Sequence, residues 1–158
     1  MNDIVLGIDL GTTNSIACIW DGNKYKLIKN EDFYLFPSII EFTKNGKLIC
    51  NNNNNNCIRN IKRFIGKNPS DVKILKLLSD LHFDCKINND QILFHNIFEN
   101  KNYTLEELNA LILKKIKKKA EKQLNMPISK VVVTVPANFD QIQRNSVVTS
   151  CKIAELNC

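Results

Sequence analysis

The first thirty residues carry the strongest constraint on the fold, an apolar run that ends in a glycine and three turn-forming polar residues. Residues Ile4–Asp9 favour a strand, and Gly11–Asn14 (Gly-Thr-Thr-Asn) favour a tight turn. A second β-rich run, Ser15–Trp20, is followed by Asp21-Gly22, a strong hairpin signal, and Tyr25–Ile28 favours a third strand. The sequence therefore predicts an antiparallel meander with the glycine and two threonines in its first turn.

The composition of that turn suits phosphate binding. Backbone N–H groups that a tight turn points in one direction bind anions, and Gly11 lets the backbone approach a phosphate with no Cβ in the way. Thr12 and Thr13 add hydroxyl donors, and the carboxylate of Asp9 suits a Mg²⁺ ion held through its water shell. On spacing alone, a plain hairpin in which the threonines only cap the turn remains open. The chain has no Gly-x-x-x-x-Gly-Lys-Ser/Thr motif and so no P-loop.

The remaining sequence alternates strand and helix signals. Further strands are expected at Pro37–Phe42, Lys47–Cys50, Phe83–Ile87, Gln91–Ile97 and Val131–Val135, and helices at Ile58–Ile65, Val72–Leu81, Thr104–Leu124 and Phe139–Leu156. The asparagine run at residues 51–56 has no apolar face, so we expect a loop outside the core. These elements predict an α/β fold with a mixed sheet.

Three of these elements have a predicted buried side. The helix after the N-cap Thr104 would bury Leu108, Leu111, Ile112, Ile116 and Ala120. The β-branched run Val131–Val135 predicts a strand buried on both faces. The final helix would bury Ile142, Val147, Cys151 and Ala154. The lysine-rich run at residues 114–119 is expected to be a solvated helix face, with an anion- or partner-binding patch as the alternative.

Composition excludes several classes of function. The 158 residues carry a net charge of +6 that comes mainly from lysine, whereas a nucleic-acid binder would show clustered arginine with aromatics. No apolar run approaches membrane-spanning length, and no secretory signal is recognisable, so we expect a cytosolic protein. The six cysteines form no C-x-x-C pair, and neither histidine sits at ligand spacing from one, which favours reduced thiols.

Four ordered segments closely resemble the heat-shock-protein-70 chaperone family. The first is Gly7–Ser15 (Gly-Ile-Asp-Leu-Gly-Thr-Thr-Asn-Ser). The others are residues 36–40 (Phe-Pro-Ser-Ile-Ile), 61–66 (Ile-Lys-Arg-Phe-Ile-Gly) and 132–139 (Val-Val-Thr-Val-Pro-Ala-Asn-Phe), the last continuing to Gln143-Arg144.

The resemblance implies the actin-like ATPase fold, which contains a ribonuclease H-like motif. It implies the first lobe only of the nucleotide-binding domain, over residues 1–158. A base subdomain would comprise about residues 1–36 and 104–158, with an inserted subdomain at about 37–103. By the same resemblance, we expect the second lobe and the peptide-binding domain to be absent.

The resemblance also assigns roles to residues. Asp9 would organise Mg²⁺ through water, and Gly11, Thr12, Thr13 and Asn14 would hold the phosphates of ATP or ADP. Lys62 resembles the family's catalytic lysine, which would place the attacking water, a role that suits the electrostatic demands of phosphoryl transfer.

Pro136 and Arg144 match a pair that couples nucleotide state to the substrate domain in the family; alternatively, they are a strand stop and a helix surface charge. Implied partners are a J-domain co-chaperone, a nucleotide exchange factor and client proteins bound through the absent domain. Asn138 and Glu155 depart from the family pattern, which has tyrosine and glycine there.

Three further alternatives remain. The spacing from Gly66 to Thr104, with Ser70-Asp71-Val72, leans towards the iron–sulfur-cluster-assembly branch of the family. A non-enzymatic module that binds a co-chaperone would keep the same fold. An actin-fold sugar kinase shares the Asp-x-Gly-Thr turn but would lack the segment at residues 61–66. Because half a nucleotide cleft cannot enclose ATP, we expect little or no ATPase activity from these residues alone.

Overall fold

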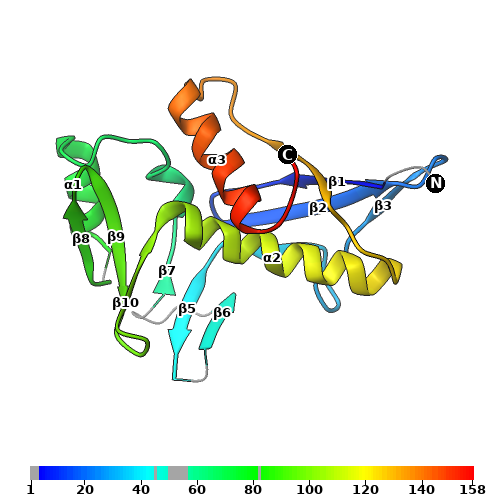
Figure 1. The fold of residues 1–158 in the computed structure, drawn as a ribbon, viewed down its shortest axis with the longest axis horizontal. Coiled ribbons are helices and arrows are strands. Elements are labelled where there is room, and N and C mark those ends of the chain that lie inside the picture. Colours follow the sequence, from blue (N-terminus) through cyan, green and yellow to red (C-terminus); the bar gives the residue numbers. More distant parts are fainter. Residues whose placement is uncertain (1–3, 45, 50–56, 82) are drawn as a thin grey trace.

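The elements of the chain build one larger sheet, two small sheets and three α-helices (Figure 1). A computed structural model describes residues 4–44, 46–49, 57–81 and 83–158. In that part of the chain, the strands are β1 (Val5–Asp9), β2 (Asn14–Trp20), β3 (Tyr25–Leu27), β4 (Leu35–Pro37), β5 (Ile40–Thr43), β6 (Gly46–Ile49), β7 (Cys57–Ile58), β8 (Cys85–Asn88), β9 (Gln91–Asn96), β10 (Lys101–Thr104) and β11 (Lys130–Thr134). The helices are the 3₁₀ turn η1 (Ile61–Arg63), α1 (Val72–Ser79), α2 (Leu105–Leu124) and α3 (Gln141–Ile153).

The larger sheet has the order β11-β1-β2-β3, and β4 also pairs with β2. The β1-β2-β3 meander is antiparallel as predicted, and β11 joins β1 in parallel. Alternate residues of the sheet, such as Leu6, Ile8, Ala17 and Ile19, are buried in one core with the inner sides of α2 and α3. The protein is therefore a mixed α/β structure, and the two helices lie side by side along the sheet (Figure 1).

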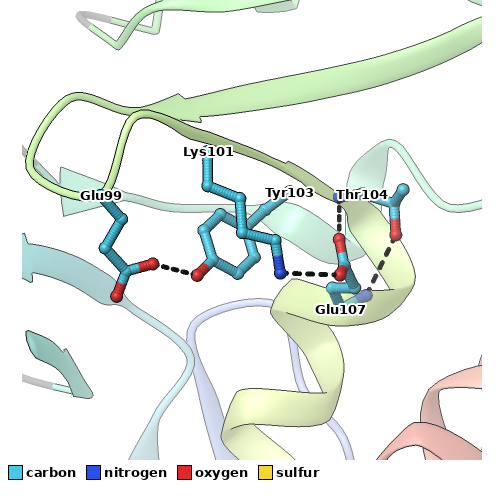
Figure 2. Close-up of polar contacts among 5 residues, drawn as sticks. All are labelled: Glu99, Lys101, Tyr103, Thr104 and Glu107. Carbon is cyan, nitrogen blue, oxygen red and sulfur yellow. Dashed lines mark hydrogen bonds and ion pairs between the residues drawn. The ribbon is translucent and has the colours of Figure 1, made fainter.

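Helix α2 begins where its sequence predicts, because Thr104 and Glu107 form a reciprocal capping box. The Thr104 hydroxyl accepts from the Glu107 N–H at 3.2 Å, and the Glu107 carboxylate accepts from the Thr104 N–H at 2.9 Å. Figure 2 shows the surroundings of this cap: Lys101 pairs with Glu107 and lies over the Tyr103 ring, and the Tyr103 hydroxyl bonds to Glu99. The predicted stripe of α2 is confirmed, with Leu111 only partly buried.

The residues between β4 and α2 form two small three-stranded sheets, with the strand orders β6-β5-β7 and β10-β9-β8. Aromatic rings join them: Phe42 of β5 lies 5.1 Å from Tyr103 of β10 and 5.8 Å from Phe83, measured between ring centroids. Phe94 of β9 contacts Phe64, which follows η1. This aromatic cluster ties the segment that carries Lys62 to the strand before α2.

The helix predicted at Ile58–Ile65 is wrong. Ile58 pairs with Ile40 at the edge of a small sheet, and only the short 3₁₀ turn η1 follows. Asn60 takes a left-handed backbone conformation (φ 57°), which separates the strand from the turn. Ile58, Ile61 and Ile65, whose spacing suggested a helix, are nevertheless all buried in the common core. Similarly, the single strand predicted at Pro37–Phe42 is split into β4 and β5.

Two predictions of burial are also wrong. Strand β11 lies at the end of the described sheet and is not buried on both faces, since Val132 is 60% exposed on the side away from the core. In α3, Ile142 is 69% exposed, and Gln143 takes the inner position at the start of the helix. Gln143 completes a capping box with Asp140 and donates to the Ile65 carbonyl at 3.1 Å, which explains how a polar side chain is buried there. Val147, Cys151 and Ala154 are buried as predicted.

Two other predictions fall partly or wholly outside what is described. The asparagine run at 51–56 and Cys50 lie outside the described residues, while the other five cysteines are free thiols. None of the described helices combines the length and apolar content needed to cross a membrane.

Candidate functional site

The turn between β1 and β2 can be made only with glycine at residue 11. A Cβ added to Gly11 would lie 1.9 Å from the carbonyl oxygen of Asn14, a backbone atom that cannot move aside cheaply. The chain therefore folds tightly back on itself between Gly11 and Asn14. Thr12 is half-buried, and Thr13 and Asn14 are exposed at the mouth of the turn.

The buried Ser38 holds the turn from behind. Its N–H donates to the Thr13 carbonyl at 2.8 Å, and its hydroxyl donates to the Gly11 carbonyl at 2.9 Å. The hydroxyl of Ser15, which is also buried, lies 3.0 Å from that of Ser38. Within the part of the chain that the structure describes, no hydrogen bond takes up the N–H groups of residues 11–13. The turn is thus fixed through its carbonyl oxygens, and its amides are available to an anion.

Asp9 is oriented by the neighbouring parallel strand. The Thr134 hydroxyl donates to Asp9 Oδ1 at 2.7 Å, and the two residues are paired in the register of β1 and β11. Both side chains lie on the exposed side of the sheet at the carboxyl ends of these strands. One carboxylate oxygen is therefore held by the fold, directly before the Gly11–Asn14 turn.

Lys62 reaches the same place from the 3₁₀ turn η1. Its Nζ donates to the carbonyl oxygen of Leu10 at 2.5 Å and lies 5.9 Å from the centre of the Phe139 ring. Partial burial lowers the pKa of Lys62, and the nearby charge of Asp9 acts in the opposite direction. The structure thus brings together the predicted residues Asp9, Gly11 and Lys62.

The donors present fit a magnesium ion bound through water. No group of three or more histidine, cysteine, aspartate or glutamate side chains forms a metal cage among the described residues. Mg²⁺ commonly keeps several waters and uses one or two carboxylates together with phosphate oxygens. Asp9, exposed and held at one oxygen by Thr134, supplies such a carboxylate.

The side chain of Arg144, in helix α3, reaches the loop that Pro136 opens at the end of β11. The Arg144 guanidinium donates to the carbonyl oxygens of Phe139 at 3.0 Å and Ala137 at 3.4 Å. The Phe139 N–H in turn donates to the Pro136 carbonyl at 3.1 Å. Arg144 therefore stabilises the loop that Pro136 opens and that places the Phe139 ring near Lys62. A role in coupling remains a prediction.

Sequence reasoning missed three supporting residues, although each lies in a segment that carries the family resemblance. Ser38 supports the turn, Thr134 orients Asp9, and Phe139 flanks Lys62. Ser38 could have been found as a small polar residue that directly follows a proline in an otherwise apolar segment. No pattern in the sequence alone places Thr134 opposite Asp9, since this requires the parallel pairing of strands 125 residues apart.

Comparison with known proteins gives a consistent picture. Residues 5–158 match the family described as Hsp70 protein. The chain is 33% identical to the chaperone protein dnaK of Cyanidium caldarium, over 97% of this chain and 26% of that protein. It is 38% identical to the chaperone protein HscA homolog of Rickettsia felis, over 96% and 23% of the two chains, and 37% identical to that of Rickettsia rickettsii, over 96% and 25%. The chain spans about a quarter of the length of these curated relatives. Its sequence from residue 5 onward places it in the Hsp70 family.

Proposed function

We propose that the Gly11–Asn14 turn, Asp9 and Lys62 bind the phosphates of ATP or ADP with Mg²⁺, in the first lobe of an actin-like ATPase domain. The observation that carries the proposal is the position of Lys62. Its Nζ donates to the carbonyl oxygen of Leu10, the residue between Asp9 and the turn, although Lys62 belongs to a segment 52 residues further along the chain. Partial burial of an ammonium group costs free energy, which an anion bound at the turn would offset.

Each residue has a distinct part in this proposal. The free amides of the turn and the hydroxyls of Thr12 and Thr13 would donate to phosphate oxygens, with Asn14 at the mouth of the turn. Asp9 would hold the hydrated metal, which supplies charge neutralisation at the phosphates. Lys62 would orient the attacking water and offset the charge that develops on the transferred phosphoryl group.

The exposure of the site limits what the 158 residues would do by themselves. Asp9, Thr13 and Asn14 are open to solvent, and electrostatic stabilisation is much weaker in contact with bulk water. We therefore propose measurable nucleotide binding and very slow hydrolysis for this chain alone.

Calorimetric titration with Mg·ATP tests the proposal. We expect Lys62→Ala and Asp9→Asn to weaken binding at least about tenfold, since each removes a charge-assisted contact. Lys67→Ala is the matched control, because Lys67 is an exposed lysine of the same segment. Equal binding by all four proteins, or loss of binding in Lys67→Ala alone, would contradict the proposed site.

We further propose that Pro136 and Arg144 couple this site to protein partners of the chaperone. The arginine fixes the loop that carries Phe139, so a change at Lys62 can be passed to that loop through the aromatic ring. A J-domain co-chaperone, an exchange factor and client proteins are the partners proposed for the whole protein. Arg144→Ala should leave Mg·ATP affinity nearly unchanged while abolishing any stimulation by a J-domain protein. Full stimulation of this variant would contradict coupling.

We further propose that the chain belongs to the branch of the family that includes the HscA homologs and that acts in iron–sulfur cluster assembly. The identity to HscA homologs (38% and 37%) exceeds that to the dnaK relative (33%), in agreement with the spacing between Gly66 and Thr104. Chimaeras test this: residues 1–158 replace the matching region in an HscA homolog or in a dnaK protein. Higher ATPase activity in the HscA chimaera is expected, and the reverse order would contradict the branch.

A further inference from the structure

A lysine-lined hollow lies on the larger sheet and shares no residue with the candidate phosphate site. It is an open surface depression of about 490 Å³ between β3, the segment after it and the end of α2. We call it the lysine hollow; its walls include Lys24, Tyr25, Lys26, Lys29, Tyr34 and Gln123. Figure 1 shows the chain after β3 passing near the C-terminal half of α2, and the Gln123 side chain of α2 bonds to the Lys29 N–H there.

The charge in the hollow is strongly one-sided. Three lysines line it, and the single acidic residue on its wall, Asp21, uses its carboxylate to accept the N–H groups of Asn23 and Lys24 at 3.0 and 2.8 Å. Those two amide bonds lower the pKa of Asp21 and belong to its own turn. Nearby Glu31 pairs with Lys119 of α2 at 3.7 Å. The Asp21 carboxylate also interacts with the charges of Lys24 and Lys26, but three lysines against one aspartate leave the lining of the hollow with a net positive charge.

The walls are also unusually aromatic for an exposed surface. Tyr25 is 75% and Tyr34 42% exposed, and the Lys29 ammonium lies 5.9 Å from the centre of the Tyr34 ring. Trp20, opposite Tyr25 in the register of β2 and β3, packs against it with 4.9 Å between ring centroids and a tilt of 58° between the ring planes. Tyrosine and tryptophan are enriched in protein-binding surfaces, where they provide much of the binding energy.

The backbone beneath the hollow is rigid. The Gln123 side chain accepts from the Lys29 N–H at 2.9 Å and donates to the Leu27 carbonyl at 3.0 Å, so it bridges the edge of β3 as a neighbouring strand would. Helix α2 thus anchors, through Gln123, the backbone of β3 and the following segment that carries these lysines and tyrosines. Preorganisation of this kind reduces the entropic cost of binding.

We propose that the lysine hollow docks an acidic peptide segment of a partner protein, one that carries apolar side chains among its carboxylates. The carboxylates pair with Lys24, Lys26 and Lys29, and the apolar side chains pack on the two tyrosines. A peptide fits better than a nucleic acid, because the cations are lysines without the planar arginine fork that grips phosphates in pairs.

The chain contains its own reporter for this test. Trp20 is the one tryptophan in the sequence and contacts Tyr25 of the hollow wall, so its fluorescence should respond to a bound peptide. The probe is a short peptide of alternating glutamate and leucine, titrated at low salt; a glutamine–leucine peptide and a single-stranded oligonucleotide are compared with it. The variant is Lys24→Glu/Lys26→Glu/Lys29→Glu. The control, Lys73→Glu/Lys76→Glu/Lys86→Glu, changes the net charge equally on exposed positions of α1 and β8.

We expect the glutamate peptide to bind saturably, with an affinity that falls as the salt concentration rises. The affinity should fall at least about tenfold in the hollow variant and stay unchanged in the control variant. Circular dichroism verifies that both variants are folded. Three results would overturn the proposal: no binding of the glutamate peptide, equal loss in both variants, or tighter binding of the oligonucleotide. Equal binding of the glutamine peptide would likewise exclude recognition of carboxylates.

Discussion

The hydroxyl of Thr134 donates to Asp9 Oδ1 at 2.7 Å, which links two strands 125 residues apart at the candidate phosphate site. Thr134→Val keeps the side-chain shape and removes the donor. We expect a loss of about 0.5–1.5 kcal/mol in the free energy of unfolding, towards the low end because both groups are exposed. Mg·ATP affinity should fall several-fold, since Asp9 is no longer oriented. Calorimetry measures both effects; Thr134→Ser should restore binding, and wild-type affinity in the valine variant would show that Asp9 needs no such support.

Gly11 should tolerate no side chain. In Gly11→Ala, the new Cβ would lie 1.9 Å from a backbone oxygen, so the turn must open. We expect destabilisation of about 2 kcal/mol, comparable with other overpacked sites, and loss of nucleotide binding. Gly7→Ala is the control: its Cβ would meet Cys18 Sγ at 3.4 Å, an ordinary contact. Denaturant unfolding distinguishes the two, and equal stability of both variants would contradict the steric account.

Nucleotide binding should depend on pH through Lys62. Burial lowers the pKa of Lys62, although Asp9 opposes this, so the ammonium loses its proton at a lower pH than an exposed lysine. We therefore expect Mg·ATP affinity to decline in the alkaline range, at a lower pH than that at which exposed lysines titrate. The same shift means that the unfolded chain binds more protons, so this group makes folding more favourable as pH rises. Lys62→Arg, which stays charged, should abolish the decline in affinity; an unchanged pH profile in that variant would assign the effect elsewhere.

Local signals predicted much of this fold, whereas features set by distant contacts could not be predicted. The Gly11 turn and the Thr104 cap each depend on neighbouring residues, and both are where the sequence places them. In contrast, the helix expected at Ile58–Ile65 gave way to pairing of Ile58 with Ile40. Lys62 was matched by resemblance, yet its contact with the Leu10 carbonyl depends on how the turn η1 packs near the end of β1, 52 residues earlier in the chain. Propensity is a weak guide wherever tertiary pairing competes with it.

Cys151 should make the protein less stable at alkaline pH. Burial, together with the nearby Cys158 thiol, raises the pKa of Cys151 to about 12 from the model-compound value of 9.0. Between these values the unfolded chain has released a proton that the native chain retains, so the free energy of unfolding falls as pH rises. The upper limit is about 1.4 kcal/mol per pH unit. Urea unfolding at a series of pH values should show a steeper decline in wild type than in Cys151→Ala, which lacks the group; equal slopes would contradict the assignment.

Glu155 is the position at which replacement should stabilise the chain. It follows the end of α3 with a left-handed backbone (φ 57°), a conformation that costs a residue with a side chain about 1 kcal/mol and costs glycine almost nothing. Its carboxylate lies 3.9 Å from the Lys117 ammonium and is 82% exposed, so that ion pair contributes little. The Lys117 bond to the Glu155 backbone carbonyl, at 3.0 Å, survives the substitution. We therefore expect Glu155→Gly to raise the Tm by about 2–4 °C. Glu155→Ala separates the two contributions, because it removes the same charge but keeps a Cβ in the left-handed region. It should give no increase, and an equal rise in both variants would mean that charge rather than backbone strain governs this helix end.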